Sequence, residues 1–441
     1  MKLFTSLIIL ILFQSCSFDT KSGIWKNENL ITDDKNELFQ GFETLTSSNK
    51  SLNRSIPIDQ NFDFNLSIPV SNLLWKDIYY NGSNNLNNFK YNDLNQLSIK
   101  SKKLTKFKTS PFKLFEEGNL IINDVRGNII VYSTNTNKII SKFNFYKKNY
   151  KKIKKNINFT VDNKIIYISD NIGYLYAFNY IKNKLVWAKN YKIPFRSNIK
   201  LIGDKLVASN QNNNLIFFDK KNGNILNSLP TEETTIKNKF INNISSDNKS
   251  LFFLNTYGSI YSVDIEQMKI NWFLNLNQSL DINPSSLFSA NEIINSKNKI
   301  VISAKEFTYI LNAKTGSIMH KKNFSSKIKP LIIDDYLFMI TKKNLLVATN
   351  LNDGNIIYSY DINQKISDFL KIRKSEVEFK NIMMINGEIY IFLRNSYLLK
   401  FNVNGKLKHV IKLKSKIYTH PILIDESILY LNFKNKYVKI D

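Results

Sequence analysis

A short pattern recurs about every 44 residues, and it limits the possible folds more than any other feature of the chain. In its second copy, GYLYAFN (173–179), a glycine is followed by alternating apolar residues and then by asparagine. The eight copies begin at positions 127, 173, 213, 258, 306, 344, 396 and 435. Periods of this length are typical of repeated units that bury their apolar faces against their neighbours.

Each copy has the pattern of a small antiparallel sheet. In the second copy, alternating apolar residues predict strands at 163–170, 174–179 and 184–187, with tight turns between them. Four-stranded sheets at this period are the blades of a β-propeller. The eight copies therefore predict an all-β, eight-bladed propeller over residues 65–441.

The last copy ends at Asp441 without the strand that should follow it. A segment upstream of the first copy is the natural source of this strand, and Leu97–Lys108 has a suitable pattern. A ring closed by strands from both ends of the chain leaves no exposed sheet edge at the junction.

The repeat resembles that of PQQ-like (WD40-like) propellers, D-x-x-G-x-L-Y-A-x-D-x-x-T-G-x-x-x-W, and residues 170–187 match it closely. In that repeat the tryptophan four residues after the turn glycine docks between neighbouring blades. The resemblance implies interblade docking for Trp187, Trp272, His320, Tyr358 and His409. His320 and His409 are therefore interpreted as packing residues rather than catalytic ones.

The N-terminal residues have the pattern of a secretion signal. Lys2 precedes the apolar run 3–13, which is too short to span a bilayer, and Cys16, the single cysteine, follows it. This arrangement resembles the lipobox of bacterial lipoproteins, which implies a signal peptide over 1–15 and a diacylated Cys16. An ordinary signal peptide with an incidental cysteine is the alternative. Residues 16–64 are expected to form a weakly ordered tether.

The chain is strongly basic, with 62 Lys+Arg against 36 Asp+Glu and a net charge of +26. Such an excess favours anionic partners, either nucleic acid or a phospholipid surface, although AT-rich coding explains a Lys-rich composition equally well. The basic run 146–156 is interpreted as a solvated loop, because a secreted lipoprotein would rarely meet nucleic acid. Apolar residues at helical spacing within 367–379 predict a short inserted helix.

No motif in the sequence indicates catalysis. HExxH, GxSxG, P-loop and GxGxxG patterns are all absent, and a single cysteine allows no intramolecular disulfide and no CxxC site. Asp334-Asp335 and Glu116-Glu117 are interpreted as turn residues. We therefore expect no enzymatic activity, no catalytic residue, no metal and no cofactor, although quinone-dependent dehydrogenases share the repeat.

A lipidated cysteine followed by an eight-bladed PQQ-like propeller resembles the BamB family of outer-membrane assembly lipoproteins. Residues 68–85, with Pro69 and Trp75, resemble the lead-in segment of some members. PFRSN (194–198) resembles the family loop whose arginine engages the barrel subunit BamA, which implies partner-binding roles for Phe195 and Arg196.

The acidic pair of the family's next loop is not matched. The corresponding stretch, 238–247, offers Lys239 and Ile241 where acids are expected.

The resemblance implies a non-enzymatic scaffold, anchored to the outer membrane by lipid and facing the periplasm. Its partners would be BamA, the β-barrel assembly complex and unfolded outer-membrane proteins, and the chain would be a monomer within that complex. The alternative is a secreted propeller that binds a small ligand or polysaccharide in its central channel.

Overall fold

The computed structural model describes residues 52–146, 150, 152–234, 242–277, 287–371 and 373–441, and the backbone of 17–19 and 24–26. The chain divides into two compact units, Met1–Asn49 and Lys50–Asp441. In the first unit, β1 (Ser17–Asp19) pairs with β2 (Ile24–Lys26) in an antiparallel hairpin.

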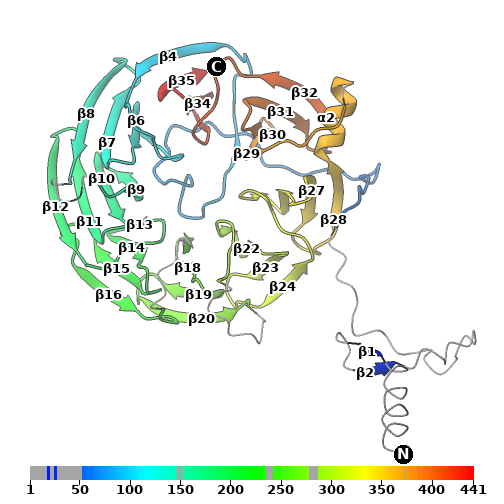
Figure 1. The fold of residues 1–441 in the computed structure, drawn as a ribbon, viewed down its shortest axis with the longest axis horizontal. Helices are drawn as coiled ribbons and strands as arrows, with labels where there is room; N and C mark the ends of the chain where they lie inside the picture. Colours follow the sequence, from blue (N-terminus) through cyan, green and yellow to red (C-terminus); the bar gives the residue numbers. More distant parts are fainter. Residues whose placement is uncertain are drawn as a thin grey trace, which may run out of the picture. The chain divides into compact units, whose positions relative to one another are not determined.

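The second unit is a ring of eight sheets, each a blade of the predicted propeller, whose strands are antiparallel apart from the parallel pairing of β3 with β29 (Figure 1). Blades 1 and 2 are β5 (Leu114–Glu116), β6 (Asn119–Asn123), β7 (Asn128–Ser133), β8 (Lys138–Asn144), β9 (Ile157–Asp162), β10 (Ile165–Asp170), β11 (Tyr174–Asn179) and β12 (Lys184–Asn190). Blades 3 and 4 are β13 (Lys200–Ile202), β14 (Lys205–Ser209), β15 (Leu215–Asp219), β16 (Ile225–Leu229), β17 (Asn243–Ser246), β18 (Ser250–Leu254), β19 (Ser259–Asp264) and β20 (Lys269–Asn275).

The second half of the ring follows the same plan. Blades 5 and 6 are β21 (Ile294–Ser296), β22 (Lys299–Ala304), β23 (Phe307–Asn312), β24 (Ile318–Lys322), β25 (Leu331–Ile333), β26 (Tyr336–Ile340), β27 (Leu345–Asn350) and β28 (Ile356–Asp361). Blade 7 is β29 (Phe379–Ile385), β30 (Glu388–Leu393), β31 (Tyr397–Asn402) and β32 (Leu407–Lys412), with β3 (Asn88–Phe89) added on its inner side. Blade 8 is β33 (Ile422–Ile424), β34 (Ser427–Leu431), β35 (Lys436–Ile440) and β4 (Leu97–Lys103).

The closing strand predicted upstream of the first repeat is confirmed as β4. It pairs antiparallel with β35, with Lys436 opposite Lys103 and Val438 opposite Lys100 (Figure 1). Strands from the two ends of the chain thus complete one sheet, so that the ring has no open junction.

Burial explains why the middle strands carry nearly continuous apolar sequence. In β11 the four residues Leu175–Phe178 are buried, because neighbouring blades cover both faces of the sheet. In the outermost strand of that blade, β12, no residue is buried, and half-buried and exposed positions alternate along its first part. The core therefore lies between the blades, repeated around the ring.

A helix is inserted after blade 6, earlier than the sequence predicted. α2 spans Ile362–Leu370, not 367–379, because the Asp361 carboxylate accepts a hydrogen bond from Gln364 N and begins the helix. Lys371 adopts a left-handed conformation and ends it.

The chain joins the propeller before residue 65, the start expected from the sequence. Ile56 pairs with Ser359 of β28, through hydrogen bonds of 2.8 Å (Ile56 N to Ser359 O) and 2.9 Å (Ser359 N to Ile56 O). Ile58 N also donates to the Tyr360 hydroxyl. Part of the expected tether is thus an extra extended segment on the outer edge of blade 6.

Candidate functional site

Residues 70–91, which we call the plug, pass through the middle of the ring (Figure 1). The plug hydrogen-bonds to the innermost strand of every blade. The contacted residues are Phe115, Val161, Lys200, Ser246, Asn295, Ile332, Ile385 and Leu423. The sequence predicted a lead-in segment here, with Trp75 in it, but not that this segment fills the channel.

A buried ion pair anchors the plug. Lys200 Nζ donates to Asp77 Oδ2 at 2.8 Å, to the Asn81 carbonyl at 2.9 Å and to Asn84 Oδ1, and the Lys200 and Asp77 side chains are 1% and 8% exposed. Burial lowers the pKa of Lys200, and the Asp77 charge acts in the opposite direction. The plug therefore supplies the charge that makes a buried lysine tolerable.

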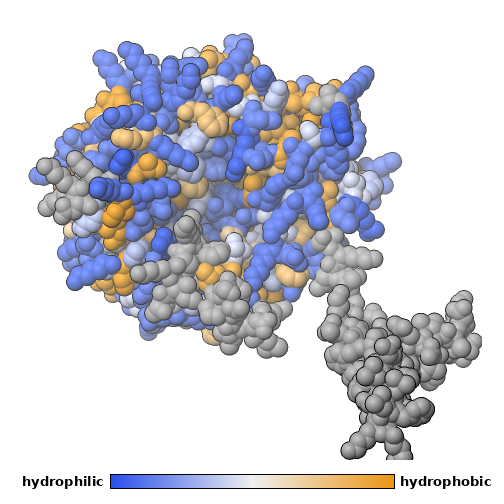
Figure 2. All heavy atoms as spheres, in the orientation of Figure 1, coloured by the Kyte–Doolittle hydropathy of each residue, from blue (hydrophilic) through white to orange (hydrophobic). Residues whose placement is uncertain are grey.

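The plug occupies the space in which the alternative interpretation expected a ligand. Atoms of the chain fill the middle of the ring in the space-filling view (Figure 2). Asn84 Nδ2 donates to the carbonyls of Ile244 and Ile293 at 2.9 and 2.8 Å, which ties the plug to blades 4 and 5 together. A ligand spanning the channel would have to displace these bonds.

The residues expected to dock between blades occupy one repeated position. In blade 2 the indole of Trp187 lies on Gly223 of the next blade, where an added Cβ would be 2.5 Å from Cζ3. Trp272 covers Gly316 and His320 covers Gly354 in the same way. These turn glycines have positive φ and no room for a side chain, which explains the Asn-Gly and Thr-Gly pairs of the repeat.

Polar residues also occupy this interblade docking position, which the sequence pattern did not predict. In five blades this residue bonds to the turn between the third and fourth strands of the next blade. The bonds are Ser141 Oγ to Asn183 Oδ1 (3.0 Å), Trp187 Nε1 to Lys220 O (3.1 Å), Asn227 Nδ2 to Met268 O (2.9 Å), Trp272 Nε1 to Ala313 O (3.1 Å), and His320 Nε2 with Asn352 O (3.1 Å).

The other two expected docking residues differ. Tyr358 is fully buried and stacks on Tyr360, with ring centroids 5.1 Å apart, and both rings cover Gly405, with Tyr360 the closer. His409 is exposed, which corrects its expected docking role. The next blade has no hairpin turn to receive it, because the fourth strand there is β4, from the start of the chain.

The predicted partner loop, 194–198, leads into β13. Phe195 is 2% exposed and lies in the core against Tyr191 and Phe218, with centroids 6.0 Å from each ring. Its side chain is covered by its own chain, so the expected partner contact of Phe195 is corrected to a packing role.

Arg196 is half-buried, and one nitrogen of its guanidinium is held by the chain. Nη2 donates to Gln211 Oε1 at 3.0 Å, while Nε is buried without an acceptor among the described residues. Burial lowers the pKa of this guanidinium. An arginine held at one nitrogen and unsatisfied at another can pair with a carboxylate from a partner.

Two glutamates lie in the next loop on the same end of the ring. The backbone carbonyl of Glu232 accepts from Asn213 Nδ2 at 2.9 Å, and Glu233 accepts from Asn214 Nδ2 at 3.3 Å. Asn242 Nδ2 donates to Asn213 Oδ1, and Asn242 N donates to the Arg196 carbonyl, which connects the two loops. The sequence analysis looked for acids at 238–247, and Lys239 and Ile241 lie outside the described residues.

The expected lipidation residue, Cys16, also lies outside the described residues. Within the described part of the chain, none of the helices has the length and apolar character that crossing a bilayer requires.

Comparisons with known proteins point to one kind of propeller. A family model described as outer membrane protein assembly factor BamB matches residues 95–286. The crystal structure of BamB from Moraxella catarrhalis is similar over 78% of this chain and 99% of that chain, with a TM-score of 0.61 and 12% identity. No curated protein matches the sequence.

An enzyme shares the architecture. Quinohemoprotein alcohol dehydrogenase from Comamonas testosteroni is similar over 83% of this chain and 80% of that chain, with a TM-score of 0.59 and 9% identity. At such identities the likeness concerns the fold alone.

The residues of this chain do not fit the calcium-bound quinone that the dehydrogenase resemblance implies. The plug fills the middle of the ring, and its hydrogen bonds hold it to every blade. The described residues contain no group of three or more His, Cys, Asp and Glu side chains suited to a metal ion. The chain is an eight-bladed β-propeller with a PQQ-like repeat, and it is similar to the BamB family model over residues 95–286.

Proposed function

We propose that this chain is a non-enzymatic scaffold of outer-membrane β-barrel assembly that faces the periplasm, is anchored through Cys16 and docks on BamA. It would hold extended segments of unfolded outer-membrane proteins while they are inserted. The match to the BamB family model supports the class of function. Three features of the described residues support the contacts with client segments and with BamA, whereas the anchor at Cys16 rests on the sequence pattern.

The observation that carries the proposal is the strand pairing at blade 6. Ile56 forms an antiparallel bridge to Ser359 of β28, with backbone bonds in both directions and a further bond from Ser359 Oγ to the Arg54 carbonyl. An outer edge of this ring therefore accepts an extended peptide. Addition of a strand to a sheet edge binds sequences with little side-chain selectivity, which suits a scaffold for many barrel proteins.

Other outer edges present apolar side chains next to free strand backbone. In the described residues no further strand pairs with β8, β12, β16, β20 or β24. The exposed apolar residues on these strands are Ile139, Ile140, Val186, Ile225, Leu226, Ile270, Phe273, Ile318 and Met319. Phe273 is 66% exposed, which favours contact with an apolar segment of a client protein.

The docking surface for BamA would be the Arg196 loop together with the loop of Glu232 and Glu233. Gln211 accepts a hydrogen bond from one end of the Arg196 guanidinium and so restricts that side chain. Arg196 therefore loses less conformational entropy when a partner binds. The glutamates would supply the acidic side of the surface, earlier in the loop than the family pattern suggested.

Arg196→Ala tests the docking surface. An interfacial arginine can contribute about 2 kcal/mol or more, so we expect about thirty-fold weaker BamA binding and an almost unchanged melting temperature. Arg373→Ala is the control, because Arg373 is an exposed arginine that follows α2 in a different part of the ring. Equal BamA recovery with both variants would remove Arg196 from the docking surface.

A further inference from the structure

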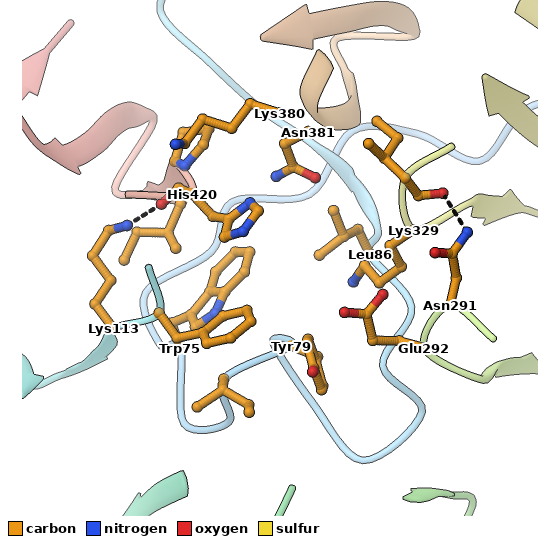
Figure 3. Close-up of a pocket in the computed structure, with 15 residues that line it drawn as sticks. Trp75, Tyr79, Leu86, Lys113, Asn291, Glu292, Lys329, Lys380, Asn381 and His420 are labelled. Carbon is orange, nitrogen blue, oxygen red and sulfur yellow. Dashed lines mark hydrogen bonds between the residues drawn. The ribbon is translucent and has the colours of Figure 1, made fainter. Parts of the chain in front are cut away.

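A cavity of about 190 Å³ opens between the plug and blades 5, 6, 7, 8 and 1, and cations surround it. Lys113, Lys329, Lys380 and His420 lie on its wall, each at or just before the innermost strand of a different blade (Figure 3). The innermost strand of every blade begins at the same end of the ring. Residues at the starts of these four strands therefore lie around the same cavity.

Within the described part of the chain, none of the three ammonium groups has a carboxylate as its hydrogen-bond acceptor. Lys113 Nζ donates to Thr419 Oγ1 at 3.0 Å and to the His420 carbonyl. Lys329 Nζ donates to the Asn84 carbonyl at 2.6 Å, and Lys380 Nζ donates to the Tyr418 carbonyl. The one carboxylate on the cavity wall is Glu292.

Burial and mutual repulsion lower the pKa values of these basic groups. Burial lowers the pKa of Lys113, which is 1% exposed, and repulsion from Lys380 adds to the effect. Burial lowers the pKa of Lys329 and of Lys380 to about 8. Burial, together with repulsion by the three lysines, lowers the pKa of His420 to about 3, so its ring is neutral. An anion in the cavity would reverse these shifts.

A second, independent observation points to a ligand. The indole Nε1–H of Trp75, a residue only 4% exposed on the cavity wall, has no acceptor among the described residues. A buried donor without a partner costs about 1–3 kcal/mol, and an oxygen atom bound in the cavity would satisfy it.

Besides these groups and the amides of Asn291 and Asn381, the wall is largely apolar. The rings of Phe112 and His420 stack with centroids 5.3 Å apart, and Leu86, Ile328 and Ile422 line other parts. An apolar cavity of about 150 Å³ is large enough for benzene. This cavity is larger, and its wall combines apolar groups with cations and one free N–H donor.

We infer that this cavity binds a small organic carboxylate with an aromatic or short apolar body, whose carboxylate meets the lysines and Trp75 Nε1 and whose body lies against Phe112 and His420. Nothing in the scaffold role requires such a ligand, so the inference stands apart from that role.

Calorimetric titration of the full chain with sodium phenylacetate tests the inference, with inorganic phosphate and benzyl alcohol as the comparison probes. We expect phenylacetate to bind at least ten-fold more tightly than either, because phosphate lacks the apolar body and the alcohol lacks the charge. Absence of phenylacetate binding at millimolar concentration would overturn the inference. If phosphate binds as tightly as phenylacetate, the ligand does not need an apolar body. The lysines would then be assigned to binding a phosphate group.

Two variants locate the site. Lys380→Met should weaken phenylacetate binding about ten-fold and, without ligand, should raise the melting temperature, because it removes a desolvated cation. Trp75→Phe should weaken binding while leaving the aromatic wall in place. Lys416→Met, at an exposed lysine between blades 7 and 8, is the control and should change neither quantity. Unchanged binding by both site variants would contradict the assignment.

Discussion

Replacing Asp77 by Asn is expected to destabilise the propeller by about 3–5 kcal/mol at pH 7. The substitution keeps the size of the side chain and the bond from Tyr79 N to Oδ1, but it removes the one charge that pairs with Lys200 among the described residues. A buried cation left alone usually costs this much. The ceiling is about 5 kcal/mol, because Lys200 can give up its proton at a cost of 1.36 kcal/mol for each pH unit below its unfolded pKa.

Because Lys200 can lose its proton in the variant, the destabilisation depends on pH. In the folded variant Lys200 would be neutral, whereas in the unfolded chain it stays protonated up to a pKa near 10.4, so raising the pH favours the folded state. The destabilisation should fall by up to about 1.4 kcal/mol per pH unit between pH 7 and pH 9. If the variant only lost packing, the destabilisation would be the same at pH 7 and at pH 9.

Denaturant unfolding at pH 7 and pH 9, followed by the fluorescence of Trp75 and the other tryptophans, measures both effects. Asp204→Asn is the control: Asp204 is 3.1 Å from Lys205 Nζ but its side chain is 76% exposed, so the change in stability should be small. If Asp77→Asn is as mild as the control, the ion pair does not hold the plug in the way described.

Three further outcomes are expected. Cys16→Ser should move the protein from the outer-membrane fraction to the soluble periplasmic fraction, because a diacyl chain supplies most of the membrane affinity; a variant that still pellets with the membrane would count against lipidation. Truncation after Val403 removes β32 to β35, so circular dichroism should report loss of cooperative folding of the whole ring; an unchanged melting transition would contradict closure through β4. Since the pKa values of Lys329 and Lys380 are about 8 in the folded protein against an ordinary 10.5, stability should rise as the pH increases from 8 towards 10.5, and Lys380→Met should show a smaller rise in thermal melts.

The ring could be predicted because its information is local and repeated. Each blade is built from adjacent hairpins, so alternating apolar residues and turn glycines within about 44 residues indicate it fully. The missing outer strand was predicted for the same reason, since one sheet lacked a member, and β4 fills that place.

The plug could not be predicted, because its contacts are long-range and polar. Asn84 bonds to residues more than a hundred positions away on two blades, and neither partner differs in sequence from other inner-strand residues. Nothing in the pattern of residues 70–91 indicates that they pass through a ring.

Two errors at the candidate sites have a related cause. The turn that would receive His409 is absent only because the ring closes through β4, a property of the whole fold. Phe195 lies beside the half-buried Arg196 in sequence, but its ring lies in the core between blades 2 and 3. The lysine cavity escaped notice because its residues are spread over more than three hundred positions.

The most direct test of the scaffold role is purification of the tagged wild-type chain from detergent-solubilised native membranes, with identification of the proteins that accompany it. We predict that BamA is recovered together with other members of the assembly complex, and that unfolded outer-membrane proteins are enriched when their insertion is blocked. Recovery of the propeller without BamA would contradict the proposed function.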